Sequence, residues 1–320
     1  MTLRVLVTDK VALSGLHPIV DDDTFEVTSV DDATGEVFLA ALSRADALIV
    51  RSATKVTRDL IEHGPQLRAI GRAGVGVDNV DIAAASERGI AVFNAPGGNT
   101  IAAAELTMAL LISVARKIPA AEASVRRGEW DRAAFKGVEL RGKTLGLIGA
   151  GRIGGEVALR CQAFGMGVVV YDPYLTEARA DQLGVQLVPF DEVLDLGDFI
   201  SIHVPLTDET RGICGWDALR RMKPTAFVVN ASRGGVVDEH ALAEALHAGE
   251  IAGAALDVYE TEPLPAGSPL RDAPNLVLTP HLGASTAEAQ VGVATEVAAK
   301  IKTLLTTGDS SEAINAGALE

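Results

Sequence analysis

Cysteine, aromatic residues and long apolar runs are all scarce in this sequence of 320 residues. The two cysteines, Cys161 and Cys214, form no CxxC pair, which argues against a metal knuckle and is typical of a protein from the reducing cytosol. Aromatic residues make up only 4% of the chain, so we expect cores built mainly from Ala, Val, Leu and Ile. No apolar run approaches the roughly 20 residues of a membrane span, and the N-terminal segment is unsuited to a signal peptide.

Basic residues are also few, with 28 Lys and Arg against 43 Asp and Glu and a formal net charge of −15. This balance argues against nucleic acids and anionic membranes as partners, because both attract clustered basic residues. The acidic runs Asp21–Asp23 and Asp31–Asp32 lack the ligand spacing of a calcium loop. We therefore expect an acidic, solvated surface, no metal, and a small molecule as the partner.

Short apolar runs alternate with Ala-rich helical stretches along the chain, which predicts two doubly wound α/β units with parallel sheets. The runs are apolar throughout rather than alternating, as expected of strands buried on both faces. The expected strands are Leu3–Val7, Phe25–Val30, Ala47–Val50, Ala69–Arg72 and Ala91–Phe93, then Thr144–Ile148, Gly167–Tyr171, Phe199–His203, Ala226–Asn230, Gly253–Asp257 and Asn275–Thr279.

Two long helical patterns flank the second group of strands, at Ile101–Arg127 and Thr286–Leu305, with Asn99 and Thr100 as plausible caps of the first. We interpret them as the two crossings between domains, which would make a hinge around a cleft. The predicted domains are 1–97 with 285–320, and a central domain over 98–284. The alternative is that both helices are ordinary elements of one domain.

A glycine loop, Gly149-Ala150-Gly151-Arg152-Ile153-Gly154, follows a good strand and opens a good helix. Gly149 allows the tight turn, Gly151 lets the backbone approach a pyrophosphate, and Gly154 lets the helix pack on the strand. The phosphates would lie at the helix N-terminus, where free N–H groups favour anions. The loop therefore predicts a dinucleotide site in a Rossmann domain.

Asp172 ends the next strand, about 20 residues after the first glycine, where an acid meets the adenosine ribose hydroxyls. A carboxylate there would repel a 2′-phosphate, which favours NAD over NADP. The alternative is a structural glycine turn followed by a coincidental aspartate. A second cluster, Gly71–Gly76, lacks the third glycine at the required step and is interpreted as a loop facing the cleft.

Three polar residues follow strands beyond the glycine loop and are candidates for chemistry. Arg233 lies between a strand and two glycines, and its planar guanidinium suits a carboxylate. His281 is the candidate acid–base group, and Glu262 is a carboxylate that would orient its ring. His203 competes with His281 but is assigned to the cofactor pocket, and Glu260 is the alternative to Glu262. Each residue also has a non-functional interpretation, as a solvated arginine, a core histidine or a surface acid.

Together these motifs resemble the D-2-hydroxyacid dehydrogenase family over nearly the whole chain. The resemblance implies a Rossmann domain inserted in a flavodoxin-like substrate domain, NAD as cofactor, and a homodimer or homotetramer that uses the helix from Ile101. It is closest to the members that oxidise D-3-phosphoglycerate to 3-phosphohydroxypyruvate at the start of serine biosynthesis. The motifs are Gly149–Gly154, Asp172, Asn230–Gly235, Glu262-Pro263, Pro280–Gly283, Arg51–Thr57, Gly71–Asp81 and His281–Thr286.

The resemblance also implies a role for each matched residue. Arg233, Glu262 and His281 would be catalytic. Cofactor contacts would come from Gly149, Gly151, Arg152, Ile153, Gly154, Asp172, His203, Val204, Pro205, Ala231, Ser232, Asp257, Gly283 and Ala284. Substrate contacts would come from Arg51, Ser52, Thr54, Arg72, Val75, Gly76 and Arg132, the last of these across a dimer.

One departure concerns the C-terminus. Many relatives that act on phosphoglycerate continue into a serine-sensing regulatory domain, whereas this sequence stops at Glu320, so we expect no such feedback. The departure keeps open a reductase of glyoxylate, hydroxypyruvate or another D-2-hydroxyacid. A non-catalytic, NAD-sensing protein similar to corepressors is the third hypothesis, although those proteins carry recruiting tails and this chain has almost none.

Overall fold

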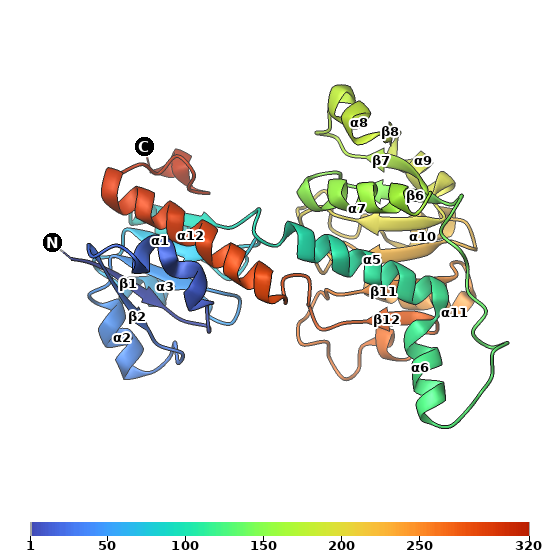
Figure 1. Ribbon diagram of the computed structural model, residues 1–320, viewed down its shortest axis with the longest axis horizontal. Helices are drawn as coiled ribbons and strands as arrows, with labels where there is room; N and C mark the ends of the chain where they lie inside the picture. Colours follow the sequence, from blue (N-terminus) through green and yellow to red (C-terminus); the bar gives the residue numbers. More distant parts are fainter. Residues whose placement is uncertain (1, 320) are drawn as a thin grey trace. The chain divides into compact units, whose positions relative to one another are not determined.

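The chain folds into two compact units, each with one sheet of parallel strands (Figure 1). The computed structural model describes residues 2–319. One unit comprises Met1–Thr100 with Ala284–Glu320, and the other comprises Ile101–Gly283. The prediction of two parallel α/β domains is confirmed.

The discontinuous unit holds a five-stranded sheet in the order β2-β1-β3-β4-β5. This is the flavodoxin-like order, in which the connections change direction between β1 and β3. Because residues Val5–Val7, Ala47–Val50 and Ala91–Phe93 are buried, both faces of this sheet are covered. The strands are β1 (Leu3–Val7), β2 (Phe25–Ser29), β3 (Ala47–Val50), β4 (Ala69–Arg72) and β5 (Ala91–Asn94).

Two apolar clusters sandwich this sheet. On one face, α1 (His17–Val20) and the long α12 (Ala287–Thr307) bury residues such as Val297 and Ile301. On the other, α2 (Glu36–Leu42), α3 (Arg58–Glu62) and α4 (Ile82–Glu87) bury Phe38 and Ile61. Short 3-10 turns lie at η1 (Leu13–Leu16) and η3 (Ala316–Ala318). The Thr286 side chain caps α12 by accepting from the Ala289 N–H.

The continuous unit holds a seven-stranded sheet in the order β12-β11-β10-β9-β6-β7-β8. Its connections change direction between β6 and β9, the Rossmann arrangement in which a crevice opens at the carboxyl ends of those strands. Its strands are β6 (Thr144–Ile148), β7 (Gly167–Tyr171), β8 (Gln186–Leu187), β9 (Phe199–Ile202), β10 (Phe227–Asn230), β11 (Gly253–Leu256) and β12 (Leu276–Leu278).

Helices cover both faces of the second sheet. One face packs against α5 (Thr100–Arg116), α7 (Arg152–Ala163) and α8 (Glu177–Leu183). The other packs against α9 (Phe190–Leu196), α10 (Trp216–Arg221) and α11 (Glu239–Ala248), with the short η2 (Pro269–Arg271) beside them. Both cysteines are buried in these cores. No helix between residues 2 and 319 is long and apolar enough to cross a membrane.

The prediction of one helix over Ile101–Arg127 is wrong, because the chain breaks at Lys117 into α5 and α6 (Ile118–Arg126), which diverge in Figure 1. Pro119 has no N–H to donate to the carbonyl of Ala115 four residues earlier, so a continuous helix cannot form there. Lys117 takes a left-handed conformation with φ 53°, and the freed Ala115 carbonyl accepts instead from the Val138 N–H at 3.0 Å.

Smaller differences concern caps and ends. The side-chain oxygens of Asn99 and Thr100 accept no hydrogen bond, so the prediction that they cap α5 is wrong. The two-residue edge strand β8 is too short to stand out in a sequence pattern. Several strands end one residue from the expected positions, as is usual for sequence-based boundaries.

Candidate active site

The glycine loop lies between β6 and α7, at the point where the second sheet changes direction. Gly149 has φ 89°, and a Cβ there would lie 2.7 Å from the His203 carbonyl oxygen. A Cβ on Gly154 would lie 2.2 Å from the Gly149 carbonyl oxygen, so the helix approaches the turn more closely than any side chain permits. A Cβ on Gly151, by contrast, would meet no protein atom within 4 Å.

This geometry fits the pyrophosphate of a dinucleotide. Gly151 is the N-cap of α7 and supplies no side-chain cap, so the first N–H groups of a 12-residue helix have no capping partner from it. Such groups and the helix dipole favour a phosphate. Asp172, directly after β7, accepts from the Ala150 N–H at 2.8 Å and from the Tyr174 N–H at 2.9 Å. Its carboxylate is thus held beside the glycine loop, with lone pairs remaining for ribose hydroxyls.

His203 follows β9 and lies against the glycine loop. A Cβ added to Gly154 would be 3.5 Å from the Cβ of His203. Its Nε2 is 2.8 Å from the Ser201 hydroxyl oxygen. Burial lowers the pKa of His203 from 6.5 to about 4, so the ring is neutral near pH 7. A neutral ring bonded to serine suits a pocket wall better than acid–base chemistry.

The lowered pKa of His203 predicts a pH dependence of stability. Between pH 6.5 and 4 the unfolded chain binds a proton at this residue and the folded chain does not, so stability is lost as pH falls through this window. We expect the His203→Gln variant, which keeps an amide for Ser201, to lose less stability than the wild type on acidification. The ratio of the folding equilibrium constants of the variant and the wild type should rise by up to about tenfold for each pH unit of acidification. Urea unfolding at pH 7, 6 and 5 measures it, and parallel losses would contradict the prediction.

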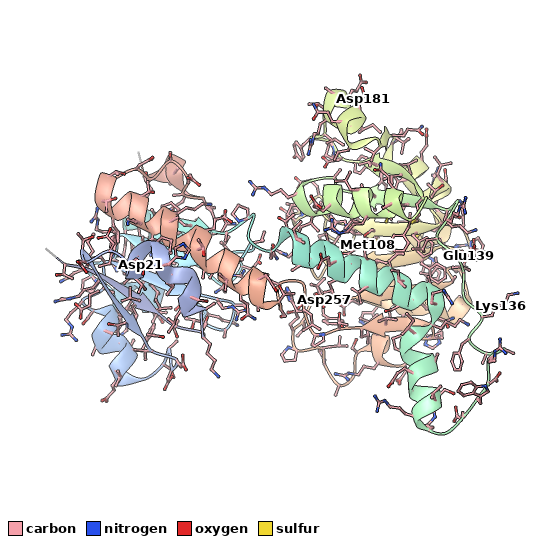
Figure 2. The ribbon with its side chains drawn as sticks, in the orientation of Figure 1. Asp21, Met108, Lys136, Glu139, Asp181 and Asp257 are labelled. Carbon is pink, nitrogen blue, oxygen red and sulfur yellow. The ribbon has the colours of Figure 1, made fainter. Side chains whose placement is uncertain are left out.

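Asp257 organises the segment that follows β12. Its buried carboxylate accepts from the Thr279 hydroxyl at 2.6 Å, the Leu282 N–H at 2.8 Å and the Gly283 N–H at 2.9 Å, and its backbone carbonyl accepts from the His281 N–H at 2.8 Å. Asp257 is labelled in Figure 2. These four bonds hold His281 in a left-handed conformation with φ 55°. The position of His281 is therefore set by the neighbouring strand β11.

His281 and Glu262 are paired, with His281 Nδ1 2.8 Å from Glu262 Oε2. The other oxygen of Glu262 accepts from the Tyr259 N–H at 3.1 Å, and the Tyr259 hydroxyl donates to the Thr279 carbonyl at 2.8 Å. Tyr259 thus ties the loop of Glu262 to the segment of His281. The imidazole is half exposed, so it is accessible to a reactant. With Nδ1 bonded to a carboxylate, Nε2 is the nitrogen left to accept or donate a proton.

Arg233 lies in the loop after β10, between β9 and β11 in the sheet. Asn230 shapes this loop by donating to the Arg233 carbonyl at 2.9 Å and accepting from the Ser232 hydroxyl at 2.7 Å. A Cβ on Gly234 would lie 1.9 Å from the Tyr259 carbonyl oxygen. Only glycine permits this approach, which brings the Arg233 loop against the loop of Glu262.

The discontinuous unit carries most of the residues expected to meet the substrate. The segment Arg51–Thr54 follows β3, and its Ser52 is exposed. Thr54 is only 6% exposed and its hydroxyl donates to Asp9 at 2.6 Å, so this side chain holds the loop in place. Arg72 ends β4, and Val75 and Gly76 follow it in a segment held by Asn94, which donates to the Val75 carbonyl at 2.6 Å. Arg132 lies in the other unit, in an exposed turn beyond α6.

Residues 108–283 match the family described as D-isomer specific 2-hydroxyacid dehydrogenase, NAD binding domain. The chain belongs to this family. The match spans the glycine loop, Asp172, Arg233, Glu262 and His281, so the continuous unit is the family's NAD-binding domain.

Relatives match over a longer stretch of the chain. It is 52% identical over 307 residues to a D-3-phosphoglycerate dehydrogenase from Methanocaldococcus jannaschii and 50% identical over 300 residues to one from Bacillus subtilis. These alignments cover 95% and 93% of the chain but 57% and 56% of the relatives, so the chain spans little more than half their length. The crystal structure of an NADPH-dependent glyoxylate/hydroxypyruvate reductase from Sinorhizobium meliloti, in complex with NADP and malonate, is 31% identical, with a TM-score of 0.83 and coverage of 98% and 96% of the two chains.

The fold therefore gathers most of the predicted site residues along the carboxyl edge of one sheet. The glycine loop, His203, Arg233, Asp257 and His281 follow β6, β9, β10, β11 and β12, which are consecutive strands of the sheet. Two residues that organise the sites were missed from the sequence, Tyr259 and Asp9. Asp9 lies two residues after the end of β1, so its place close behind a strand is a signal that could have identified it.

Proposed function

We propose that this 2-hydroxyacid dehydrogenase oxidises D-3-phosphoglycerate to 3-phosphohydroxypyruvate with NAD, at the start of serine biosynthesis in the cytoplasm. The observation that carries the reaction class is the 2.8 Å bond between His281 Nδ1 and Glu262 Oε2, in the unit that also holds the glycine loop. Identities of 50% and 52% to phosphoglycerate dehydrogenases support the substrate.

The proposed chemistry divides between two side chains. Bound NAD would supply the hydride acceptor for the carbon that bears the hydroxyl. His281 would take the hydroxyl proton at Nε2, and Glu262 would stabilise the resulting imidazolium through Nδ1. Arg233 would bind the carboxylate through its planar guanidinium and stabilise charge on the C2 oxygen. Asp172 would accept from the ribose hydroxyls and disfavour the 2′-phosphate of NADP.

The choice of substrate rests on the second anionic group of phosphoglycerate. Arg233 alone suffices for the carboxylate of an unphosphorylated acid, so Arg51, Arg72 and Arg132 support a phosphorylated one. The alternative is reduction of glyoxylate or hydroxypyruvate, which the similarity to the Sinorhizobium meliloti reductase favours. Measuring NADH formation with D-3-phosphoglycerate, and NADH consumption with glyoxylate, separates the two. A higher kcat/KM for glyoxylate would overturn the proposal.

Reversing the charge of Arg51 is expected to raise the KM for D-3-phosphoglycerate by about tenfold or more with little change in kcat, because only binding of the phosphate is lost. The matched control is Arg44→Glu. Arg44 is exposed and precedes β3, whereas Arg51 follows it, so the same change of charge falls at the opposite edge of one sheet. Steady-state kinetics of Arg51→Glu and Arg44→Glu check this, and equal KM values would contradict a phosphate role.

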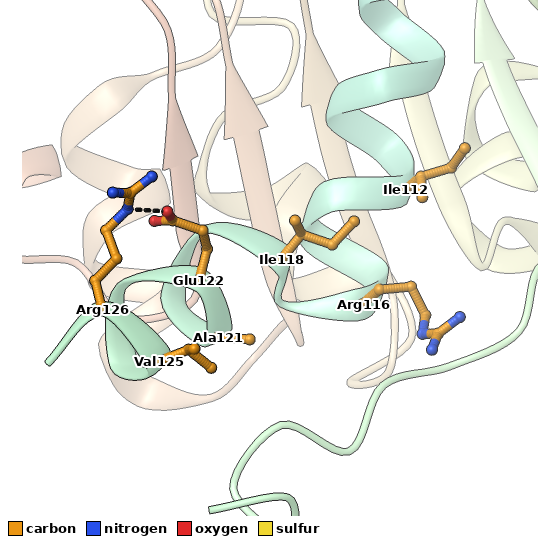
Figure 3. Close-up of a pocket in the computed structure, with 7 residues that line it drawn as sticks. All are labelled: Ile112, Arg116, Ile118, Ala121, Glu122, Val125 and Arg126. Carbon is orange, nitrogen blue, oxygen red and sulfur yellow. Dashed lines mark hydrogen bonds and ion pairs between the residues drawn. The ribbon is translucent and has the colours of Figure 1, made fainter. Parts of the chain in front are cut away.

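We further propose that the dehydrogenase forms a homodimer through α5 and α6. A hollow of about 610 Å³ lies here, lined by Ile112, Arg116, Ile118, Ala121, Glu122, Val125 and Arg126 (Figure 3). The Val125 side chain is 56% exposed, and Trp130, just beyond α6, is 80% exposed. Together with the largely apolar hollow they support an interaction surface, because contiguous exposed apolar patches mark such surfaces. Arg132 lies two residues after Trp130, where it would reach a partner's substrate.

Introducing a charge into the hollow is expected to produce monomers. The Val125→Glu variant would bury a carboxylate in an apolar interface, which disfavours association. Leu196→Glu is the matched control, because Leu196 ends α9 on the opposite face of the sheet and is 42% exposed. Analytical ultracentrifugation measures the mass of each. A wild-type monomer, or a Val125→Glu variant with the wild-type mass, would contradict the proposed interface.

A further inference from the structure

Asp9 and Asn79 hold the Arg51–Thr54 loop from its two sides. One carboxylate oxygen of Asp9 accepts from the Arg51 N–H at 2.8 Å and the Thr54 N–H at 3.0 Å, and the other accepts from the Thr54 hydroxyl at 2.6 Å. The Asn79 amide donates to the Arg51 carbonyl at 2.7 Å and the Thr54 carbonyl at 2.7 Å. Side chains thus satisfy the N–H and the C=O of both end residues of the loop.

The residues between these anchors are presented to solvent. Ser52 and Ala53 are exposed, whereas Thr54 is buried. The loop belongs to no helix or strand, so its shape depends on these side-chain bonds rather than on a regular backbone pattern. Fixing the backbone of Arg51 at both its N–H and its C=O also fixes the Cα–Cβ bond from which the Arg51 side chain starts.

The backbone at Asp9 is unusual. Asp9 has φ 60° and the next residue, Lys10, has φ 52°, so two consecutive residues other than glycine lie in the left-handed region. This region is unfavourable for most side chains and is retained where surrounding contacts enforce it, commonly at functional sites. Asp9 lies two residues after the end of β1 and Arg51 directly follows β3, the two strands between which this sheet changes direction. Ligands of open α/β sheets bind at such a point.

We propose that Asp9 and Asn79 are positioning residues that fix the Arg51–Thr54 loop for binding the anionic group of the substrate distal to its carboxylate, an inference that rests on the proposed function. Asp9 does not itself meet the substrate, because a carboxylate would repel an anion. It acts through Arg51, whose guanidinium would bind the anion. The energetic gain is pre-organisation: a loop already in its binding shape loses less conformational entropy when the substrate binds.

The test removes the carboxylate without disturbing the backbone preference. Glycine adopts positive φ freely and asparagine tolerates it, so Asp9→Gly deletes the acceptor while Asp9→Asn keeps one oxygen and an amide for Thr54. We expect Asp9→Gly to raise the KM for D-3-phosphoglycerate by about tenfold or more with kcat nearly unchanged, and Asp9→Asn to restore most of the loss. In an Arg51→Ala background the effect of Asp9→Gly should fall below about threefold, since Asp9 acts through Arg51.

Asp32→Gly is the matched control, because one oxygen of Asp32 accepts from the Thr34 N–H at 2.9 Å and the Thr34 hydroxyl at 2.7 Å in the same unit but outside this loop. We expect its KM to equal that of the wild type. If Asp9→Gly does not fold, the pair Thr54→Val and Thr54→Ser replaces it: valine removes the hydroxyl donor to Asp9 and should raise the KM, whereas serine keeps it.

Two outcomes would overturn the positioning role: an Asp9→Gly variant with the wild-type KM, or an equal effect of Asp9→Gly with and without Arg51. Hydrogen exchange of a peptide covering residues 48–56 gives a readout independent of the substrate. The Arg51 and Thr54 amides should exchange faster in Asp9→Gly. If the wild type oxidises no D-3-phosphoglycerate, the proposed function fails, and this exchange result still decides whether Asp9 holds the loop.

Discussion

Replacing His281 with asparagine is expected to lower kcat by about 10²–10⁴-fold, the usual contribution of a positioned acid–base group, while leaving the affinity for NADH nearly intact. Asparagine is chosen because His281 has φ 55°, a conformation that asparagine adopts more readily than alanine. The imidazole is then lost without a penalty from the backbone. Steady-state kinetics and NADH fluorescence titration measure the two quantities.

Two further variants sharpen this test of His281. His247→Ala removes an exposed histidine at the end of α11 and should leave kcat unchanged. Glu262→Gln removes the charge beside Nδ1 but keeps a polar side chain, so we expect a loss of kcat smaller than that of His281→Asn. Near-normal turnover in His281→Asn would exclude the acid–base role, and a loss of NADH affinity equal to the loss of kcat would indicate that the site had collapsed.

A single methyl group added to the glycine loop is expected to prevent tight NAD binding. The Cβ of Gly151→Ala would meet no protein atom within 4 Å, so the variant should fold with the wild-type Tm. The same methyl group would occupy the space that the pyrophosphate needs at the N-terminus of α7. We expect the Kd for NADH to rise by about tenfold or more, which is about 1.4 kcal/mol.

Neighbouring glycines provide controls for Gly151→Ala. In Gly155→Ala the new Cβ would lie 3.6 Å from Leu183, an ordinary contact, so both Tm and Kd should stay near the wild-type values. In Gly154→Ala the Cβ would lie 2.2 Å from the Gly149 carbonyl oxygen, so both stability and affinity should fall. Calorimetry and fluorescence titration compare the three. A Gly151→Ala variant that binds NADH like Gly155→Ala would show that the loop does not hold the phosphates.

Local patterns predicted much of this molecule because they reflect local physics. The continuous apolar runs predicted buried parallel strands, and the spacing from Gly149 to Asp172 depends on one strand–helix–strand unit. The break at Lys117 was missed even though Pro119 was visible, because the Ala-rich pattern continues across it. The hydrogen bond by which Thr54 anchors its loop was not predicted for another reason. The Thr54 hydroxyl donates to Asp9, 45 positions earlier in the chain, and no local pattern encodes that bond.

The sequence by itself determined the fold class, the glycine loop and the identity of Arg233, Glu262 and His281 as candidates, since strand periodicity and motif spacing follow from backbone geometry. Only the tertiary structure decided how those residues meet. His281 reaches Glu262 because Asp257 fixes the segment after β12, and the loop of Arg233 touches the loop of Glu262 because Gly234 has no side chain. The Arg51–Thr54 loop is shaped by Asp9, just after β1, and by Asn79, in the segment between β4 and α4. Hydrogen bonds between segments distant in sequence form only when the sheets bring strand ends together.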